Sequence, residues 1–135
     1  MGLLRTADVL RRRAGEVVEP FGVTLQQYNV LRILRGAGDE GLPTLAIPER
    51  MIEQTPGITR LIDRLVAKGL VRRTRVAGDR RRVQCRITPL GLDLLGRMDA
   101  AVEAFDERAV SPLTTSESET LTVLLERLRS ALDPS

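Results

Sequence analysis

A helical repeat of apolar residues in the middle of the chain constrains the fold more than any other feature. Apolar side chains recur at Ile58, Leu61, Ile62 and Leu65, the spacing that places them on one face of an amphipathic helix. The opposite face carries polar and charged residues: Thr59, Arg60, Asp63, Arg64 and Lys68. Such a helix packs on a core by one face and leaves the other free for solvent or a ligand.

The residues on either side of this helix predict its ends. Thr55-Pro56 suits the start, because the Thr hydroxyl can accept a hydrogen bond from an N–H of the first turn. Proline is tolerated at the first helical position, since the N–H that it lacks would have no partner within the helix. Gly69 suits a left-handed residue that ends the helix. Residues 70–76 then have strand character.

A basic β-hairpin is the predicted continuation. Ala77-Gly78-Asp79-Arg80 can form its turn, since Gly adopts positive φ freely and Asp can bond the turn backbone. Val83–Ile87 would be the return strand, with Val83, Cys85 and Ile87 on one face. Three consecutive cations would then lie at or beside the tip: Arg80, Arg81 and Arg82. This arrangement is typical of the wing of a winged-helix domain.

Two helices are predicted before this module. Apolar residues recur at helical spacing through the N-terminal segment, which predicts a helix over about residues 3–19 that Pro20 ends. Arg11-Arg12-Arg13 lies on this helix. These arginines either form solvated surface or contact phosphate, and we favour the solvated surface. The capping box Thr24-Leu25-Gln26-Gln27 opens a second helix to about Arg35.

A short third helix is predicted over residues 45–51, and a turn then leads into the basic helix. Together they make a helix-turn-helix. Pro48 conflicts with this helix, because its ring and its missing N–H would disturb the fourth position of a helix that began at Thr44. We therefore expect a helix that is distorted in its first turn or that begins after Thr44. Its buried side is expected to hold Leu45, Ile47 or Pro48, and Met51.

The last third of the chain is predicted to form two more helices. Thr88-Pro89 repeats the Thr-Pro start and opens a long helix to about Ala109, and the capping box Thr114-Thr115-Ser116-Glu117 opens a last helix to about Leu132. Together with the first helix, they carry more apolar surface than a compact winged helix needs. We expect two-fold pairing between copies to bury this surface; a monomer whose helices cover one another is the alternative.

Charge is distributed unevenly along the chain. Residues 50–88 hold 11 Lys or Arg against three acids, a net charge of +8, so the rest of the chain carries −5 of the total of +3. A positive lobe on an otherwise acidic protein favours a polyanionic partner, because each neutralised phosphate releases condensed counterions. A solvated charged surface is the alternative, but these cations lie on a helix followed by a hairpin.

Composition argues against several other classes of protein. With one Cys and no His, the chain lacks ligands for a zinc site and cannot form an internal disulfide, which suits a reducing, cytoplasmic location. A hydrophobic content of 42% without a long apolar stretch argues against membrane insertion. Residues 1–6 fit a loose N-myristoylation pattern, which a plain chain start explains better. No residue constellation suggests an enzyme, and no cofactor is expected.

Three motifs occur in a fixed order along the chain. They are TPGITRLIDRL with KGLVRR in residues 55–73, GDRRR in residues 78–82, and ITPLG in residues 87–91. In this order and spacing they resemble the MarR family of bacterial transcription regulators, and the resemblance covers nearly the whole chain.

The resemblance implies a mainly α fold with minor β content. The resemblance further implies that the chain forms a single domain over residues 1–135. A winged helix-turn-helix lobe with a two-stranded β-wing would occupy residues 22–88, and helical dimerisation regions would occupy residues 1–21 and 89–135. It also implies an obligate homodimer that binds a pseudo-palindromic operator in double-stranded DNA, most simply as a repressor.

The resemblance also assigns residues to DNA contacts. In the family, certain positions of the recognition helix contact base edges and phosphates in the major groove. The residues that match these positions are Thr55, Pro56, Thr59, Arg60 and Arg64. In the wing, Asp79 and Arg81 match a pattern in which the acid orients an arginine that enters the minor groove; Asp79 could instead only close the turn. The other predicted contacts are Arg73, Arg75, Arg80 and Arg82.

Members of the family often bind small aromatic or anionic effectors, so an effector of unknown identity that releases the repressor is a further predicted partner. The three aromatic residues suit core positions better than a ligand site: Phe21, Tyr28 and Phe105. Cys85 likewise suits a buried core position better than the role of a redox switch. The alternative function is a winged-helix adaptor that contacts proteins without specific DNA binding.

Overall fold

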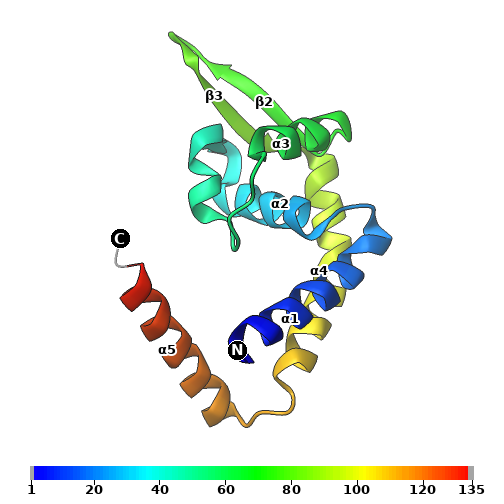
Figure 1. The fold of residues 1–135 in the computed structure, drawn as a ribbon. Helices are drawn as coiled ribbons and strands as arrows, with labels where there is room; N and C mark the ends of the chain where they lie inside the picture. The colour runs from blue at the N-terminus through cyan, green and yellow to red at the C-terminus, as the bar shows by residue number, and fades with distance from the viewer. Residues whose placement is uncertain (1, 134–135) are drawn as a thin grey trace. The chain divides into compact units, whose positions relative to one another are not determined.

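The computed structural model describes residues 2–133, except for the side chains of residues 79–81. The chain forms two compact units, Met1–Val102 and Glu103–Ser135. The first unit contains α1, α2, α3, the three strands and most of α4, and the second contains the end of α4 and α5 (Figure 1). Among the described residues, no helix combines the length and the apolar character that crossing a bilayer requires.

The first two helices form as predicted. Helix α1 spans Gly2–Val18 and is followed by the 3-10 helix η1, Glu19–Phe21. Helix α2 spans Leu25–Ala37. Its capping box is complete: the Thr24 hydroxyl accepts the Gln27 N–H at 3.1 Å, and the Gln27 side-chain carbonyl accepts the Thr24 N–H at 3.0 Å. The local sequence therefore fixes the entry into α2 without help from the rest of the fold.

The predicted third helix is wrong. Its residues form two 3-10 turns instead, η3 at Thr44–Ala46 and η4 at Pro48–Arg50. Pro48 is the first residue of η4, where its missing N–H costs nothing. Ile47 between the turns is fully buried, as expected, whereas Leu45 is 86% exposed, contrary to the expectation that it faces the core. Breaking the helix at Pro48 thus removes the conflict seen in the sequence.

Helix α3 begins later than predicted, at Ile58, and runs to Ala67. Gly57 precedes it with a φ of 74°, in the left-handed region. The Thr55 hydroxyl donates to the Glu53 carbonyl at 3.2 Å and does not cap the helix, so the predicted start at Thr55-Pro56 is wrong. The predicted end is confirmed, because Gly69 follows the helix with a φ of 76°.

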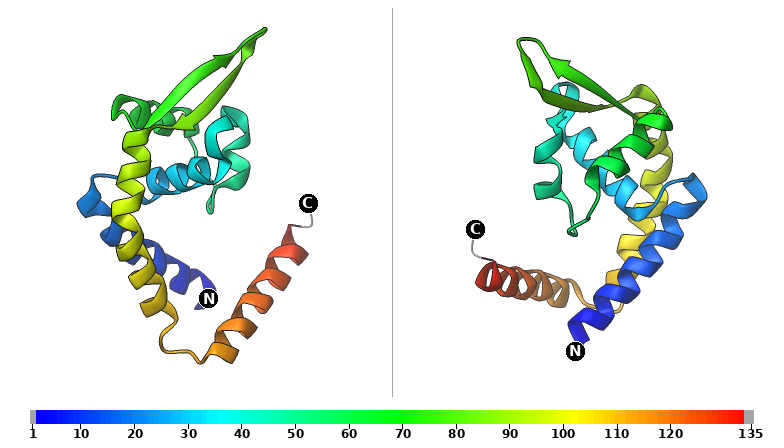
Figure 2. Two further views of the ribbon diagram at one scale, coloured as in Figure 1. Left: turned by 180° about the vertical axis from the view of Figure 1, so that it is seen from behind. Right: turned by 45° about the horizontal axis from the view of Figure 1, so that its top comes forward.

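The wing is confirmed, with one additional strand. Strand β2 (Val71–Val76) pairs with β3 (Asp79–Ile87), and the short strand β1 (Leu42–Pro43) pairs with the other edge of β3, so the antiparallel order is β1-β3-β2. The turn is only Ala77-Gly78, and β3 therefore begins before Val83. In Figures 1 and 2 the hairpin extends well beyond the helices of its unit.

Gly41 allows β1 to approach β3. Its φ is 67°, and a Cβ atom at this position would lie 2.1 Å from the carbonyl oxygen of Cys85. A side chain is therefore excluded by both the backbone conformation and the neighbouring strand. Two-residue strands containing proline carry almost no sequence signal, which is why β1 was not predicted.

Helix α4 spans Pro89–Val110 and starts as predicted. The Thr88 hydroxyl accepts the Gly91 N–H at 3.1 Å and donates to the Gly69 carbonyl at 2.6 Å. The helix thereby begins against the end of α3. The core of the first unit draws fully buried side chains from α1, α2, η3–η4, α3, β3 and α4: Val18, Val30, Leu31, Leu34, Ile47, Ile62, Leu65, Cys85, Leu95 and Met98.

Helix α5 in the second unit spans Thr115–Leu132. Its predicted capping box is confirmed, since the Thr114 hydroxyl accepts the Glu117 N–H at 3.1 Å and the Glu117 carboxylate accepts the Thr114 N–H at 2.9 Å. No residue of α5 is buried. Its leucine side chains are exposed along its length: Leu121, Leu124, Leu125, Leu128 and Leu132.

Candidate nucleic-acid interface

The outer face of α3 presents the predicted recognition residues to solvent. Thr59, Arg60 and Arg64 are all exposed. The guanidinium groups of Arg60 and Arg64 have no carboxylate or hydrogen-bond partner among the described residues. Pro56 is exposed and Thr55 half-buried, but both lie before the first turn of α3. The helix itself therefore offers two arginines and one hydroxyl to an external ligand.

Asp63, on the same exposed side of α3, forms an ion pair with Arg73 of β2, at 2.5 Å between carboxylate and guanidinium. The two side chains are 50% and 34% exposed. This contact joins the recognition helix to the wing across ten residues of sequence. Periodicity places each residue on its element but contains no signal for the pair, so Asp63 was not recognised as a partner of a predicted contact residue.

A groove of about 660 Å³ lies where η3, the start of α3 and the wing meet. Four predicted contact residues line it: Thr59, Arg73, Arg75 and Arg82. In the strand register Arg73 lies opposite Cys85 and Arg75 opposite Val83, so both arginines are on one face of the hairpin. The exposed side chain of Leu45 also lines the groove. Arg60 and Arg64 are not part of its lining.

The wing tip is described only in part. Arg82 is exposed, as predicted for a residue near the tip. The side chains of Asp79, Arg80 and Arg81 lie outside the described residues, so their proposed roles stay predictions.

The base of the wing is held by side chains on its other face. The Gln84 amide donates to the Glu40 carbonyl at 3.1 Å, and Arg86 Nε donates to the Asp39 carbonyl at 2.9 Å. Arg86 also donates to the Thr74 hydroxyl at 2.6 Å. One cation of the basic lobe is therefore used to fix the sheet to the segment after α2.

The C-terminal end of α3 is held in a similar way. Lys68 Nζ donates to the Gly22 carbonyl at 2.6 Å and to the Gln27 side-chain carbonyl at 3.2 Å. Gln27 is almost fully buried and also completes the capping box of α2. Lys68 thus connects the recognition helix to the start of α2, a role that its place on the polar face of α3 does not reveal.

The turn before α3 is tied to α1. Arg11 Nε donates to both carboxylate oxygens of Glu53, at 2.8 and 3.0 Å. This hydrogen bond, followed by the attraction of the Glu53 charge, raises the pKa of Arg11 above its ordinary value, so the guanidinium stays charged. Arg12 and Arg13 pair with acids of α1 itself. These contacts agree with a solvated surface for the three arginines.

Comparison with known proteins then identifies the family. The model of the MarR family matches residues 23–83. The crystal structure of a MarR transcription factor from Planctomyces limnophilus is 41% identical in sequence, covers 92% of this chain and 90% of its own, and superimposes with a TM-score of 0.72. The chain belongs to the MarR family. It is accordingly a transcription regulator and not an enzyme.

Two further proteins match nearly the whole chain. The transcriptional repressor Rv2887 of Mycobacterium tuberculosis is 27% identical and covers 95% of this chain and 91% of its own length. MepR of S. aureus, crystallised in complex with DNA, is 25% identical, covers 96% of this chain and 95% of its own, and has a TM-score of 0.86.

The predicted core positions of this MarR-family chain are largely confirmed. Cys85 is fully buried in the centre of the sheet, with its sulfur 3.3 Å from the Thr44 hydroxyl. Tyr28 is buried, and Phe21 packs against the same core. Phe105 is half-buried in the second unit. The aromatic residues of the first unit are thus used for packing.

Proposed function

We propose that this regulator binds double-stranded DNA through α3 and the wing. The observation that carries the proposal is the grouping of Thr59, Arg73, Arg75 and Arg82 around one groove, beside the exposed Arg60 and Arg64. Arginine forms bidentate hydrogen bonds with guanine in the major groove and is attracted to narrow minor grooves. In this proposal α3 lies in the major groove and the wing tip, with Asp79 and Arg81, reaches the minor groove.

The proposed active form is a homodimer. Exposed apolar residues run along α1 and α5: Leu3, Leu4, Val9, Leu10, Leu121, Leu124, Leu125 and Leu128. Burying a leucine side chain completely stabilises by roughly 1.5–3 kcal/mol, so pairing of such faces would be strongly favourable. We assign residues 22–88 to DNA binding and residues 1–21 and 89–135 to dimerisation. A two-fold dimer would bind half-sites of a pseudo-palindrome about one helical turn apart.

The proposed biological role is a cytoplasmic repressor that a small molecule releases from its operator. The name of the mycobacterial relative, a transcriptional repressor, supports the first part. Effector release follows from the family resemblance, because effectors are frequent among its members.

Fluorescence anisotropy on duplexes selected from random DNA by the purified protein tests the proposal. We expect sequence-selective binding that weakens steeply with added salt, because the contacts to phosphate release counterions. Analytical ultracentrifugation of the complex should give two chains per duplex. Weak binding that does not change with salt would contradict the proposal and favour the protein-binding adaptor.

A further inference from the structure

Leu45 is an unusual lining residue of the groove where η3, the start of α3 and the wing meet. Its side chain is 86% exposed, although an apolar side chain gains free energy when it leaves water. Pro43 pairs with Gln84 at the edge of the sheet, and the Thr44 hydroxyl donates to the Val83 carbonyl at 3.4 Å. The backbone directly before Leu45 is therefore fixed to the wing, and η3 directs the leucine side chain into solvent.

Leu45 shares the groove with other apolar residues and with cations. Pro43 and Val83 are half-buried and line the same groove. Three arginines also line it: Arg73, Arg75 and Arg82. Single exposed apolar residues are common on protein surfaces. Apolar side chains grouped with cations in one groove are instead complementary to a ligand that has both apolar and anionic parts.

The position of the groove identifies the part of DNA that it faces. In the proposed complex α3 lies in the major groove and the wing tip reaches the minor groove. Thr59 of α3 and the strands of the wing line opposite sides of the groove in the protein. In a duplex, the sugar-phosphate backbone of one strand separates the major groove from the minor groove. That backbone alternates phosphates with deoxyriboses, so it has both anionic and apolar surfaces.

We propose that this groove holds the sugar-phosphate backbone of one DNA strand, with Leu45 packed against the C2′ methylene of a deoxyribose and the arginines beside its phosphates. The inference rests on the proposed function. A ribose would place a 2′-hydroxyl against Leu45, which removes the hydroxyl from water and offers it no hydrogen bond. Leu45 therefore selects deoxyribose over ribose at one nucleotide of each half-site.

Fluorescence anisotropy with operator duplexes tests the role of Leu45. Leu45→Ala should weaken binding about tenfold, because it removes apolar surface that the complex buries. Leu45→Met retains an apolar side chain of similar size and should bind within about twofold of the wild type. Ile52→Ala is the matched control. It removes the same number of carbon atoms from a residue that is 71% exposed but outside the groove lining, so DNA affinity should not change.

A series of operator duplexes, each with one ribonucleotide, locates the sugar. At one position in each half-site, the 2′-hydroxyl should weaken wild-type binding about fivefold and Leu45→Ala binding less than about twofold. A 2′-fluoro nucleotide at that position favours the sugar pucker of RNA but has no hydroxyl, so it should weaken binding by the wild-type protein less than ribose does. Equal weakening by 2′-fluoro and ribose would show that the protein senses pucker and would overturn the contact with Leu45.

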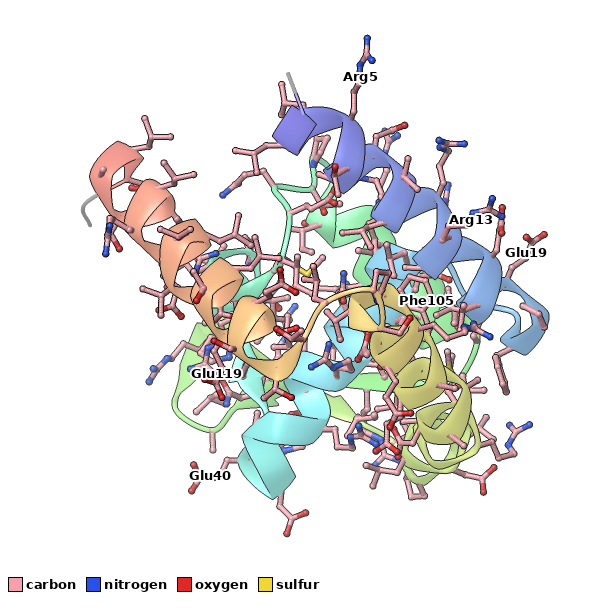
Figure 3. The ribbon with its side chains drawn as sticks, turned by 90° about the horizontal axis from the view of Figure 1, so that it is seen from below. Arg5, Arg13, Glu19, Glu40, Phe105 and Glu119 are labelled. Carbon is pink, nitrogen blue, oxygen red and sulfur yellow. The ribbon has the colours of Figure 1, made fainter. Side chains whose placement is uncertain are left out.

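Neutral phosphates test the arginines of the groove. A methylphosphonate linkage beside the sensitive nucleotide removes one negative charge and should weaken wild-type binding severalfold. At least one of Arg73→Gln, Arg75→Gln and Arg82→Gln should show a smaller loss, because the charge contact is already absent. Arg5→Gln is the control and should respond as the wild type does, since Arg5 extends away from α1 into solvent (Figure 3). Equal losses in all three groove variants would overturn the placement of the phosphates.

The remaining outcomes separate this inference from its alternatives. Unchanged affinity of Leu45→Ala, with folding checked by thermal melting, would overturn it. Replacing a thymine by uracil removes only a base methyl group. A response to this change that depends on Leu45 would place the side chain against a base instead. A lower sedimentation coefficient of Leu45→Ala without DNA would make Leu45 a contact between copies.

The wild-type protein separates failure of this inference from failure of the proposed function. Absence of DNA binding by the wild type would contradict the proposed function and the inference together. Selective, salt-dependent binding that does not respond to any Leu45 variant would contradict the inference alone.

Discussion

Seven of the eleven cations in the basic lobe form two groups that differ in their surroundings. Three anchored cations bind other parts of the same unit: Lys68, Arg73 and Arg86. Four outer cations have no hydrogen-bond or carboxylate partner among the described residues: Arg60, Arg64, Arg72 and Arg82. The net charge of the lobe therefore includes cations with two different roles. Some cations hold the lobe together, while others remain available to a polyanion.

The anchored cations also differ in how much of their positive charge remains unneutralised at the protein surface. Lys68 and Arg86 bind neutral carbonyl groups, so their positive charge still contributes to the field at the surface. Arg73 binds the Asp63 carboxylate, which cancels its charge at short range. Anchoring to backbone carbonyls therefore fixes the positions of α3 and the wing without reducing the attraction for DNA.

The largest expected effect is on the base of the wing. Gly41→Ala should lower the free energy of unfolding by on the order of 3 kcal/mol, because it adds left-handed strain and a contact 2.1 Å from the Cys85 carbonyl oxygen. Gly22→Ala is the matched control: its φ is also positive, but no atom lies within 4 Å of the added Cβ, so the cost should be about 1–2 kcal/mol. Urea denaturation measures both, and equal losses would show that the close approach of β1 to β3 is unimportant.

A matched pair of charge removals on α3 separates the two groups directly. Arg60→Gln should weaken operator binding by about 10- to 100-fold and leave unfolding unchanged, because Arg60 is exposed and unpartnered. Lys68→Gln removes the same charge at the C-cap of the same helix, but it should cost about 1 kcal/mol of stability, since it breaks the contacts to Gly22 and Gln27. Its effect on operator binding should be the smaller one.

Anisotropy on folded protein and urea denaturation give the two readouts for each variant. If Arg60→Gln instead lost stability and Lys68→Gln lost the larger share of operator affinity, the division into anchored and outer cations would be wrong.

Local chemistry explains which parts of the fold were predictable. Capping boxes at Thr24 and Thr114 involve residues three positions apart, so the sequence alone determines them. The two Thr-Pro motifs look alike, yet only Thr88 caps its helix. After Thr55, the left-handed Gly57 delays the helix until Ile58. A local motif therefore succeeds only where the following residues permit helical geometry.

The candidate site was predictable residue by residue but not in its contacts. Periodicity placed Thr59, Arg60 and Arg64 on the exposed face of α3, and the structure agrees. The ion pair between Asp63 and Arg73 and the bonds of Lys68 depend on how separate elements pack. Such long-range contacts leave no periodic signal, so the sequence predicted Arg73 as a DNA contact without indicating its ion pair and gave no indication that Lys68 anchors the helix.

The smallest expected effect concerns the ion pair between Asp63 of α3 and Arg73 of the wing. Asp63→Asn should change the free energy of unfolding by less than about 1 kcal/mol, because the pair is exposed and such pairs contribute little. It also releases the charge of Arg73, so DNA affinity should rise and its dependence on salt should steepen by up to about one counterion. Arg73→Gln breaks the same pair but removes a positive charge, and its DNA affinity should fall. Opposite signs in anisotropy would show that Asp63 limits the charge available to DNA, whereas equal losses in both variants would show that the pair orients Arg73 for binding.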